Sequence, residues 1–214
     1  MDIVAWAHSV KATSANDTIR DFSKDAQKIV DSYLHGKMGY ANARNAFSRL
    51  VDEAWINVSE QAWADGGRDL ASLSNKLLTE ELSRQREFAN NLFERLKDGK
   101  DGAVAAGESP LDVGLGAGDR WASGLRGQYN QIKMQTQAGK RATRYVWALG
   151  ATEEHCMTCS ELAAGEAHTM DWFLTRGYIP GMNGANLECG GWRCDCTLLE
   201  ASGDDFTLTP DLED

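Results

Sequence analysis

The residues of this chain that could do chemistry are concentrated in its last third. All five cysteines lie between positions 156 and 196, as Cys156-Met-Thr-Cys159, then Cys189, then Cys194-Asp-Cys196. Because the rest of the chain contains no cysteine, we expect the five sulfurs to share one site. A gap of two residues lets both sulfurs of a Cys-x-x-Cys pair face one ion, each about 2.3 Å from zinc.

A tetrahedral zinc site would take Cys156 and Cys159 plus two of the three later cysteines, with a histidine as a possible substitute. The candidate metal ligands are Cys156, Cys159, Cys189, Cys194, Cys196 and His168, with His155 as a further substitute. The 29 residues between Cys159 and Cys189 exceed the roughly 15 to 20 of a zinc ribbon. Structural zinc is the first expectation, disulfides between the early and late cysteines the second, and unbridged packing thiols the third.

Catalytic uses of the cysteines fit the pattern less well. Zinc deaminases need a His-x-Glu motif, and the chain contains none. A thioredoxin-type redox pair needs Cys-x-x-Cys at a helix start within a βαβ unit, whereas helical patterns precede Cys156. Nucleophilic catalysis through His155 or His168 stays open, although a histidine beside a cysteine cluster is more often a ligand or its hydrogen-bond partner.

The composition is that of an ordinary globular protein of 214 residues, with 42% apolar and 25% charged residues. A net charge of -10 disfavours general nucleic-acid binding, because the surface field repels phosphates. We find no run of about 18 apolar residues that would predict a membrane span, and no basic segment typical of a signal peptide. We therefore expect the chain to be made in a reducing cytosol, where cysteines persist as thiols or metal ligands.

Three long stretches of the first half show apolar residues at three- and four-residue steps, which is typical of amphipathic helices. Asn16 or Asp17 is placed to cap the first of these helices. The helices are predicted over residues 19–34, 43–62 and 70–96, and end at Gly36, at Gly66-Gly67 and at Gly99. None can bury its apolar stripe alone, so they should pack together or against another subunit.

Glycines interrupt the periodicity between positions 99 and 118, which predicts a linker or an exposed loop. A further helix is predicted over 120–138 and closed by Gly139. The segment 144–149 is rich in strand formers and ends at Gly150, so we expect a strand that leads into the first cysteine pair.

The predicted fold is mainly α with a small α+β cysteine-rich C-terminal module. A helical bundle or hairpin occupies 1–98 and a glycine-rich linker or loop 99–118. The module, stapled by zinc or by disulfides, occupies 119–200, and an acidic tail follows over 201–214. The tail is expected to be solvated and to keep the protein soluble; docking onto a basic partner is the alternative.

Two segments of the last third together resemble a known pattern. The first runs from Trp147 through Cys156-Met-Thr-Cys159 to Leu162, and the second is Leu187-Glu-Cys189-Gly-Gly-Trp-Arg-Cys194-Asp-Cys196-Thr-Leu. They are similar to the C-terminal domain of the Mu F-like minor head proteins of tailed phages, the head morphogenesis family. The resemblance covers residues 119 to 200. Cys189 stands where members commonly have a Pro/His-rich run, and the resemblance does not extend to 1–98.

The resemblance implies a low-copy virion component, made in the host cytoplasm, that acts near the portal during head assembly and head–tail joining. Its implied partners are phage portal, capsid or connector proteins and other copies of itself. Together with the charge and hydropathy, the resemblance leads us to expect neither membrane nor general nucleic-acid binding, and no enzymatic activity. Two other classes stay open: a cysteine-dependent redox or hydrolytic enzyme, and a zinc-dependent adaptor that binds host proteins.

Overall fold

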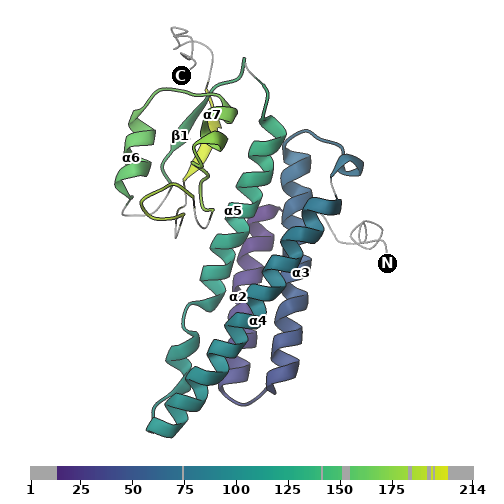
Figure 1. Ribbon diagram of the computed structural model, residues 1–214, viewed down its shortest axis with the longest axis vertical. Coiled ribbons are helices and arrows are strands. Elements are labelled where there is room, and N and C mark those ends of the chain that lie inside the picture. Colours follow the sequence, from purple (N-terminus) through teal and green to yellow (C-terminus); the bar gives the residue numbers. More distant parts are fainter. Residues whose placement is uncertain are drawn as a thin grey trace.

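The computed structural model describes residues 14–73, 75–140, 142–150, 155–182, 185–191, 194 and 196–201, with only the backbone for 75–77. Within these residues, four long helices form an elongated bundle, and a small module with a two-stranded sheet lies beside one end of the last helix (Figure 1). The predicted fold class, mainly α with a small α+β cysteine-rich module, is confirmed. Residues 1–13 of the predicted helical domain and the acidic tail from 202 onward lie outside the described residues.

The bundle helices follow the predicted periodicity, except that the third, predicted over 70–96, begins only at Asn75, after a turn over 70–72. Ser14 caps the first helix, since its Oγ accepts a hydrogen bond of 3.2 Å from the Asp17 backbone N–H. Gly67, with φ of 75°, follows the second helix, as the Gly66-Gly67 signal predicts. The helices are α2 (Ala15–Leu34), α3 (Tyr40–Asp65), α4 (Asn75–Ala106) and α5 (Ala117–Gln137), with short 3-10 turns η1 (Leu70–Ser72) and η2 (Pro110–Gly114). Among the helices described, none combines the length and the apolar character that crossing a bilayer requires.

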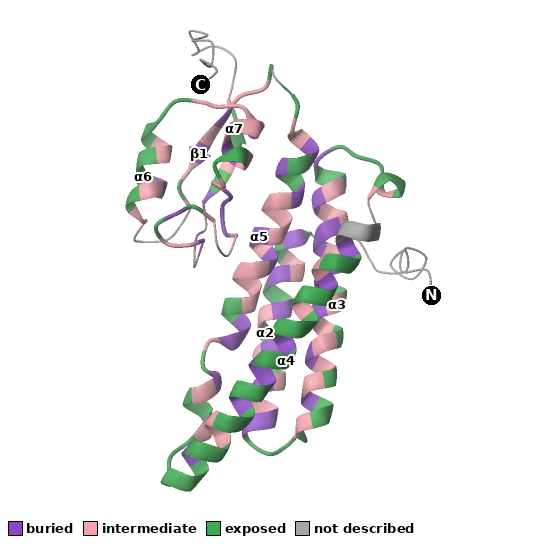
Figure 2. Ribbon diagram, in the orientation of Figure 1, coloured by how far each residue is buried: buried purple, intermediate pink, exposed green. Residues whose placement is uncertain are grey.

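Aromatic side chains from all four helices meet in the bundle core. Phe47 of α3 lies edge-to-face with Phe93 of α4 at 5.4 Å and with Trp121 of α5 at 5.2 Å between ring centroids. Phe22 of α2 meets Trp55 of α3 in the same way at 6.1 Å. Each such pair adds about 0.5–1.5 kcal/mol beyond its area burial, so the aromatic network fixes how the helices pack. Figure 2 shows the buried residues on the inward faces of these helices.

The predicted linker over 99–118 is corrected by the structure. Helix α4 continues through Gly99 to Ala106, and η2 and the start of α5 pack against α2. The glycines there allow close approach: a Cβ at Gly114 would lie 2.5 Å from Val30 Cγ1, and one at Gly118 would lie 2.2 Å from the Ser23 carbonyl oxygen. These glycines therefore mark close packing of the chain against α2, which a composition argument cannot distinguish from a hinge.

The C-terminal module has its own apolar core around a short antiparallel sheet. Strand β1 (Tyr145–Ala148) pairs with β2 (Thr197–Glu200), Tyr145 opposite Glu200 and Ala148 opposite Thr197. Helices α6 (Met157–Ala164) and α7 (Met170–Thr175) lie between the two strands in sequence. The predicted strand over 144–149 corresponds to β1, whereas α6, α7 and β2 were not predicted.

Helix α5 contributes to both the helical bundle and the C-terminal module. The module therefore does not begin at residue 119 as predicted. Leu125 lies in the bundle core, and Met134, further along the same helix, lies in the module core. Gly127 lets α5 approach the module, since a Cβ there would lie 2.5 Å from the Gly181 carbonyl oxygen. Asn130 then donates a 2.7 Å hydrogen bond to the Pro180 carbonyl. The bundle therefore runs to the end of α5 and supports the module from one side.

Candidate metal centre

The first cysteine pair is positioned by the start of α6. Cys156 is the N-cap residue, and its Sγ accepts a hydrogen bond from the Cys159 backbone N–H at 3.4 Å. A thiol here takes the place of the hydroxyl or carboxylate that usually caps a helix. The turn directs Cys159 into the module core, where it is only 2% exposed, while Cys156 stays half-buried.

The last two cysteines are positioned by the sheet. Cys196 immediately precedes β2, so the pairing of Ala148 with Thr197 holds it at one end of the strand pair. Both Cys194 and Cys196 are buried. Cys194 Sγ lies 3.9 Å from Cys159 Sγ, and Cys196 Sγ lies 3.9 Å from His155 Nδ1. The sheet therefore brings the end of the chain back to the start of α6.

Cys189 reaches the site through contacts between its loop and α6. The Glu188 carboxylate accepts a 2.7 Å hydrogen bond from the Met157 backbone N–H, and the Glu188 backbone N–H donates to Thr158 Oγ1 at 3.2 Å. Gly191, with φ of 77°, follows, and a Cβ there would lie 1.9 Å from the Met182 carbonyl oxygen. Only glycine fits this position, which explains the glycine pair after Cys189.

Two groups of sulfurs result, and both include Cys159. Cys156, Cys159 and Cys189 form one group, and Cys159, Cys194 and Cys196 form the other, with all sulfurs of a group within 4.8 Å of one another. All five cysteines are free thiols, so the disulfides of the second expectation are not formed. These clusters could hold a metal ion.

Searches against protein-family models, curated proteins and solved structures find no match.

The surroundings change the acidity of the thiols in different directions. Burial raises the pKa of Cys159, and the hydrogen bond with Cys156 raises it further. Burial also raises the pKa of Cys194, to about 11. For Cys156, burial acts in the same direction, but hydrogen bonds from the backbone N–H groups of Cys159 and Cys189 outweigh it and lower the pKa. Without a cation Cys159 and Cys194 are neutral thiols, and a bound metal would displace their protons.

His168 belongs to neither sulfur group among the described residues. Its ring stacks on Trp172, with 3.7 Å between centroids and 5° between planes. Its backbone N–H donates to the Tyr145 carbonyl at 3.0 Å and its carbonyl accepts from the Tyr145 N–H at 2.7 Å. His155, which the sequence suggests only as a substitute ligand, is the histidine beside the sulfurs.

The structure also bears on the redox alternative. Cys156 and Cys159 do lie at a helix start after a strand, as a thioredoxin-type pair requires. However, the strands on either side of α6 and α7 pair antiparallel, so the described residues contain no parallel βαβ unit. The position of Cys156 could have been found from the sequence, because Cys-x-x-Cys followed by a short apolar run is compatible with a helix cap.

Proposed function

We propose that this chain is a structural protein of a tailed-phage virion, a minor head or portal-proximal component that acts in head assembly and head–tail joining. One observation carries the proposal. The separated segments that resemble the Mu F-like module contribute to a single core, which contains Trp147, Leu162, Leu187 and Leu198 together with all five cysteines. The residues of the pattern therefore belong to one structural unit, as the resemblance implies.

Zinc is the ion that best suits this module. Thiolate sulfur and imidazole nitrogen are soft or borderline ligands that zinc binds in tetrahedral structural sites. The two-stranded sheet and two short helices form a thin core, and such modules commonly need a metal staple. The role proposed for the metal is therefore to hold the module rigid, and no catalytic step is assigned to it.

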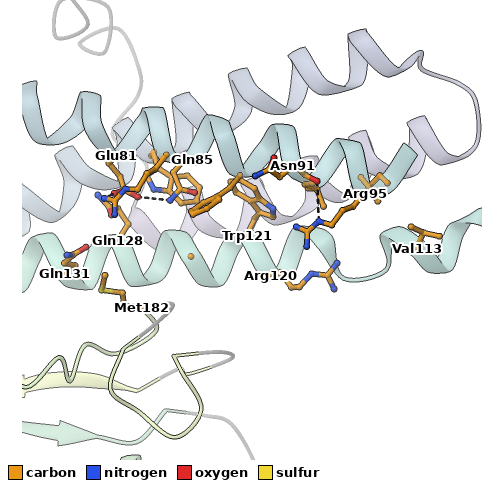
Figure 3. Close-up of a pocket in the computed structure, with 16 residues that line it drawn as sticks. Glu81, Gln85, Asn91, Arg95, Val113, Arg120, Trp121, Gln128, Gln131 and Met182 are labelled. Carbon is orange, nitrogen blue, oxygen red and sulfur yellow. Dashed lines mark hydrogen bonds and ion pairs between the residues drawn. The ribbon is translucent and has the colours of Figure 1, made fainter. Parts of the chain in front are cut away.

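The bundle offers a surface for an assembly partner. A groove of about 1190 Å³ runs between α4 and α5, with Trp55, Leu92, Leu96 and Trp121 among its lining residues (Figure 3). Arg95 of α4 and Arg120 of α5 lie toward the same end of the groove (Figure 3). The groove lining carries three arginines and one glutamate, although the whole chain carries a net charge of -10. The positive charge of the lining supports an amphipathic helix that carries an acidic residue as the ligand of the groove, and this helix would belong to a portal or capsid protein.

Co-purification with particles tests the proposed function. A tagged chain, expressed during infection by the phage that encodes it, should sediment with heads and persist through washing, at a fixed copy number measured by quantitative mass spectrometry. Recovery only in the fractions without particles, while normal heads form, would contradict the proposal. Capture of host proteins instead would favour the zinc-dependent adaptor.

Charge reversal tests the groove separately. The double variant Arg95→Glu/Arg120→Glu should reduce incorporation into heads by at least about tenfold, which corresponds to about 1.4 kcal/mol of lost binding. Lys24→Glu/Lys28→Glu is the matched control, because it changes the same charge on exposed positions of α2 outside the groove. Equal incorporation of the two variants would rule out the groove as the contact.

The redox alternative has one observation in its favour, the lowered pKa of the half-buried Cys156 thiol at the start of α6. A redox thiol of this kind should react with iodoacetamide at pH 7 much faster than free cysteine, in the presence as well as the absence of zinc. Protection of Cys156 by zinc would instead support the structural metal site.

A further inference from the structure

The two sulfur groups form a pattern that a single metal ion does not explain. A mononuclear tetrahedral site needs four ligands around one point. Among the described residues, the sulfurs that lie within 4.8 Å of one another form two sets of three, and the sets share only Cys159. Cys156 and Cys189 therefore share a group with Cys159 that does not include Cys194 or Cys196.

The inner group has three thiols at the spacing of a tetrahedral site. With zinc–sulfur bonds of about 2.3 Å, two thiolates on a tetrahedral ion lie about 3.8 Å apart. The 3.9 Å between the sulfurs of Cys159 and Cys194 is close to this value. His155 Nδ1 lies 3.9 Å from Cys196 Sγ but not within 4.8 Å of all three sulfurs, so it would become the fourth ligand after a shift of its ring. All three cysteines of this group are buried and His155 is half-buried, so the inner site is more enclosed than the outer one.

The outer group has three thiols and reaches the surface. Cys156 and Cys189 are half-buried, and the buried sulfur of Cys159 is the third member of the group. Backbone N–H groups already point at the outer sulfurs: those of Cys159 and Cys189 donate to Cys156, and that of Gly191 donates to Cys189. Such hydrogen bonds stabilise thiolates. A water molecule would supply the fourth ligand of an ion held here.

We propose that the module binds two divalent thiophilic ions, zinc in the cell, bridged by the Cys159 thiolate. The inner ion takes Cys159, Cys194, Cys196 and His155, and the outer ion takes Cys159, Cys156, Cys189 and a water. Each bound thiol loses its proton to solvent. Five thiolates nearly neutralise two divalent ions, whereas a single tetrahedral ion would take at most four of the five thiols and leave the remainder protonated. The inference rests on the metal-stapled module of the proposed function and adds the second ion and the bridge.

The bridge predicts different behaviour for the two ions. The more enclosed inner site should release its ion more slowly. The outer site, with one water ligand and half-buried sulfurs, should exchange its ion first when a chelator is added. Chelation should therefore remove the metal in two steps, and the protein with one ion should keep the module folded.

Cadmium-113 NMR of the full chain tests the bridge directly, because cadmium binds thiolates as zinc does and has a nuclear spin of one half. Two resonances with mutual scalar coupling, together with two zinc ions per chain in native mass spectrometry, are the expected result. A single resonance at saturation, or two resonances without coupling, overturns the proposal.

Variants provide a second test. Cys189→Ser should retain one ion per chain, with the inner resonance kept and the coupling lost, while the control His168→Ala should retain two. Two ions in Cys189→Ser would contradict the assignment of the outer site. One ion per chain in the native protein would overturn the two-ion centre but leave the single-zinc staple and the virion role intact. Absence of the chain from heads would overturn the virion role but leave the two-ion centre intact. The two proposals can therefore fail separately.

Discussion

Cys159 is the residue on which the chemistry of the module depends. It is 2% exposed, its sulfur belongs to both groups, and its backbone N–H donates to Cys156. Burial raises the pKa of its thiol above the usual value, so the proton stays on at neutral pH until a cation replaces it. Metal affinity should therefore rise with pH, because each ion that binds must displace protons.

The two histidines near the module give a prediction at the same scale. His155→Ala should weaken the tightest zinc binding by about tenfold or more, since a ligand atom of a closed tetrahedral site is lost. His168→Ala should leave zinc affinity unchanged, because that ring stacks on Trp172 away from the sulfurs. Competition with a chromophoric chelator measures both affinities. Equal affinities in the two variants would show that His155 is not a ligand.

The ligand residues could be predicted from the sequence only in part. Clustering alone indicates that the five cysteines belong together, and the structure brings them into two adjoining groups. The histidines cannot be ranked by spacing, because the direction of each ring depends on tertiary contacts. His168 is held by backbone hydrogen bonds to Tyr145, and that pairing exists only once β1 has formed.

At the scale of elements, glycines decide how closely the helices approach. Gly118 places the start of α5 directly on the backbone of α2. Gln27 fixes the approach, since its side chain accepts a hydrogen bond from the Gly118 N–H at 3.1 Å and donates to the Gly114 carbonyl at 3.2 Å. The segment expected to be a linker is therefore part of the packing that positions α5 and, through α5, the module.

Paired alanine substitutions test this account of the glycines. Gly118→Ala should destabilise the chain by about 1–3 kcal/mol, because the new methyl group overlaps the Ser23 carbonyl oxygen. Gly102→Ala, on an exposed part of α4 with no atom within 4 Å of a new Cβ, should stabilise it by about 0.5–1 kcal/mol through helix propensity. Urea unfolding monitored by circular dichroism measures both. A stabilising Gly118→Ala would contradict the close packing of α2 and α5.

The elements differ in how far periodicity could predict them. The four long helices span enough turns for their apolar stripes to be recognised, and the start of α2 differs from the expected cap by two or three residues. Helices α6 and α7 have only eight and six residues, and β2 has four, too few to establish a period. Their positions depend on packing around the sulfurs and on the pairing of β2 with β1.

At the scale of the whole molecule, α5 joins two cores that would otherwise be separate. Its first half packs with α2 and α3, and its second half contributes Met134 to the module. The bundle core contains no cysteine, so it should stay folded when metal is removed. The apolar core of the module is small, so the module should depend on the metal. The proposed assembly role needs this rigidity, since the groove and the module must be presented together.

Hydrogen–deuterium exchange with and without a chelator tests the central claim most directly, that metal held by the five cysteines keeps the module folded. Chelation should abolish amide protection across residues 156–196, and stoichiometric zinc should restore it, while protection of α2 and α3 should not change. The double variant Cys156→Ser/Cys159→Ser should behave as the chelated protein does. Unchanged protection of 156–196 in the chelated, metal-free chain would contradict the claim.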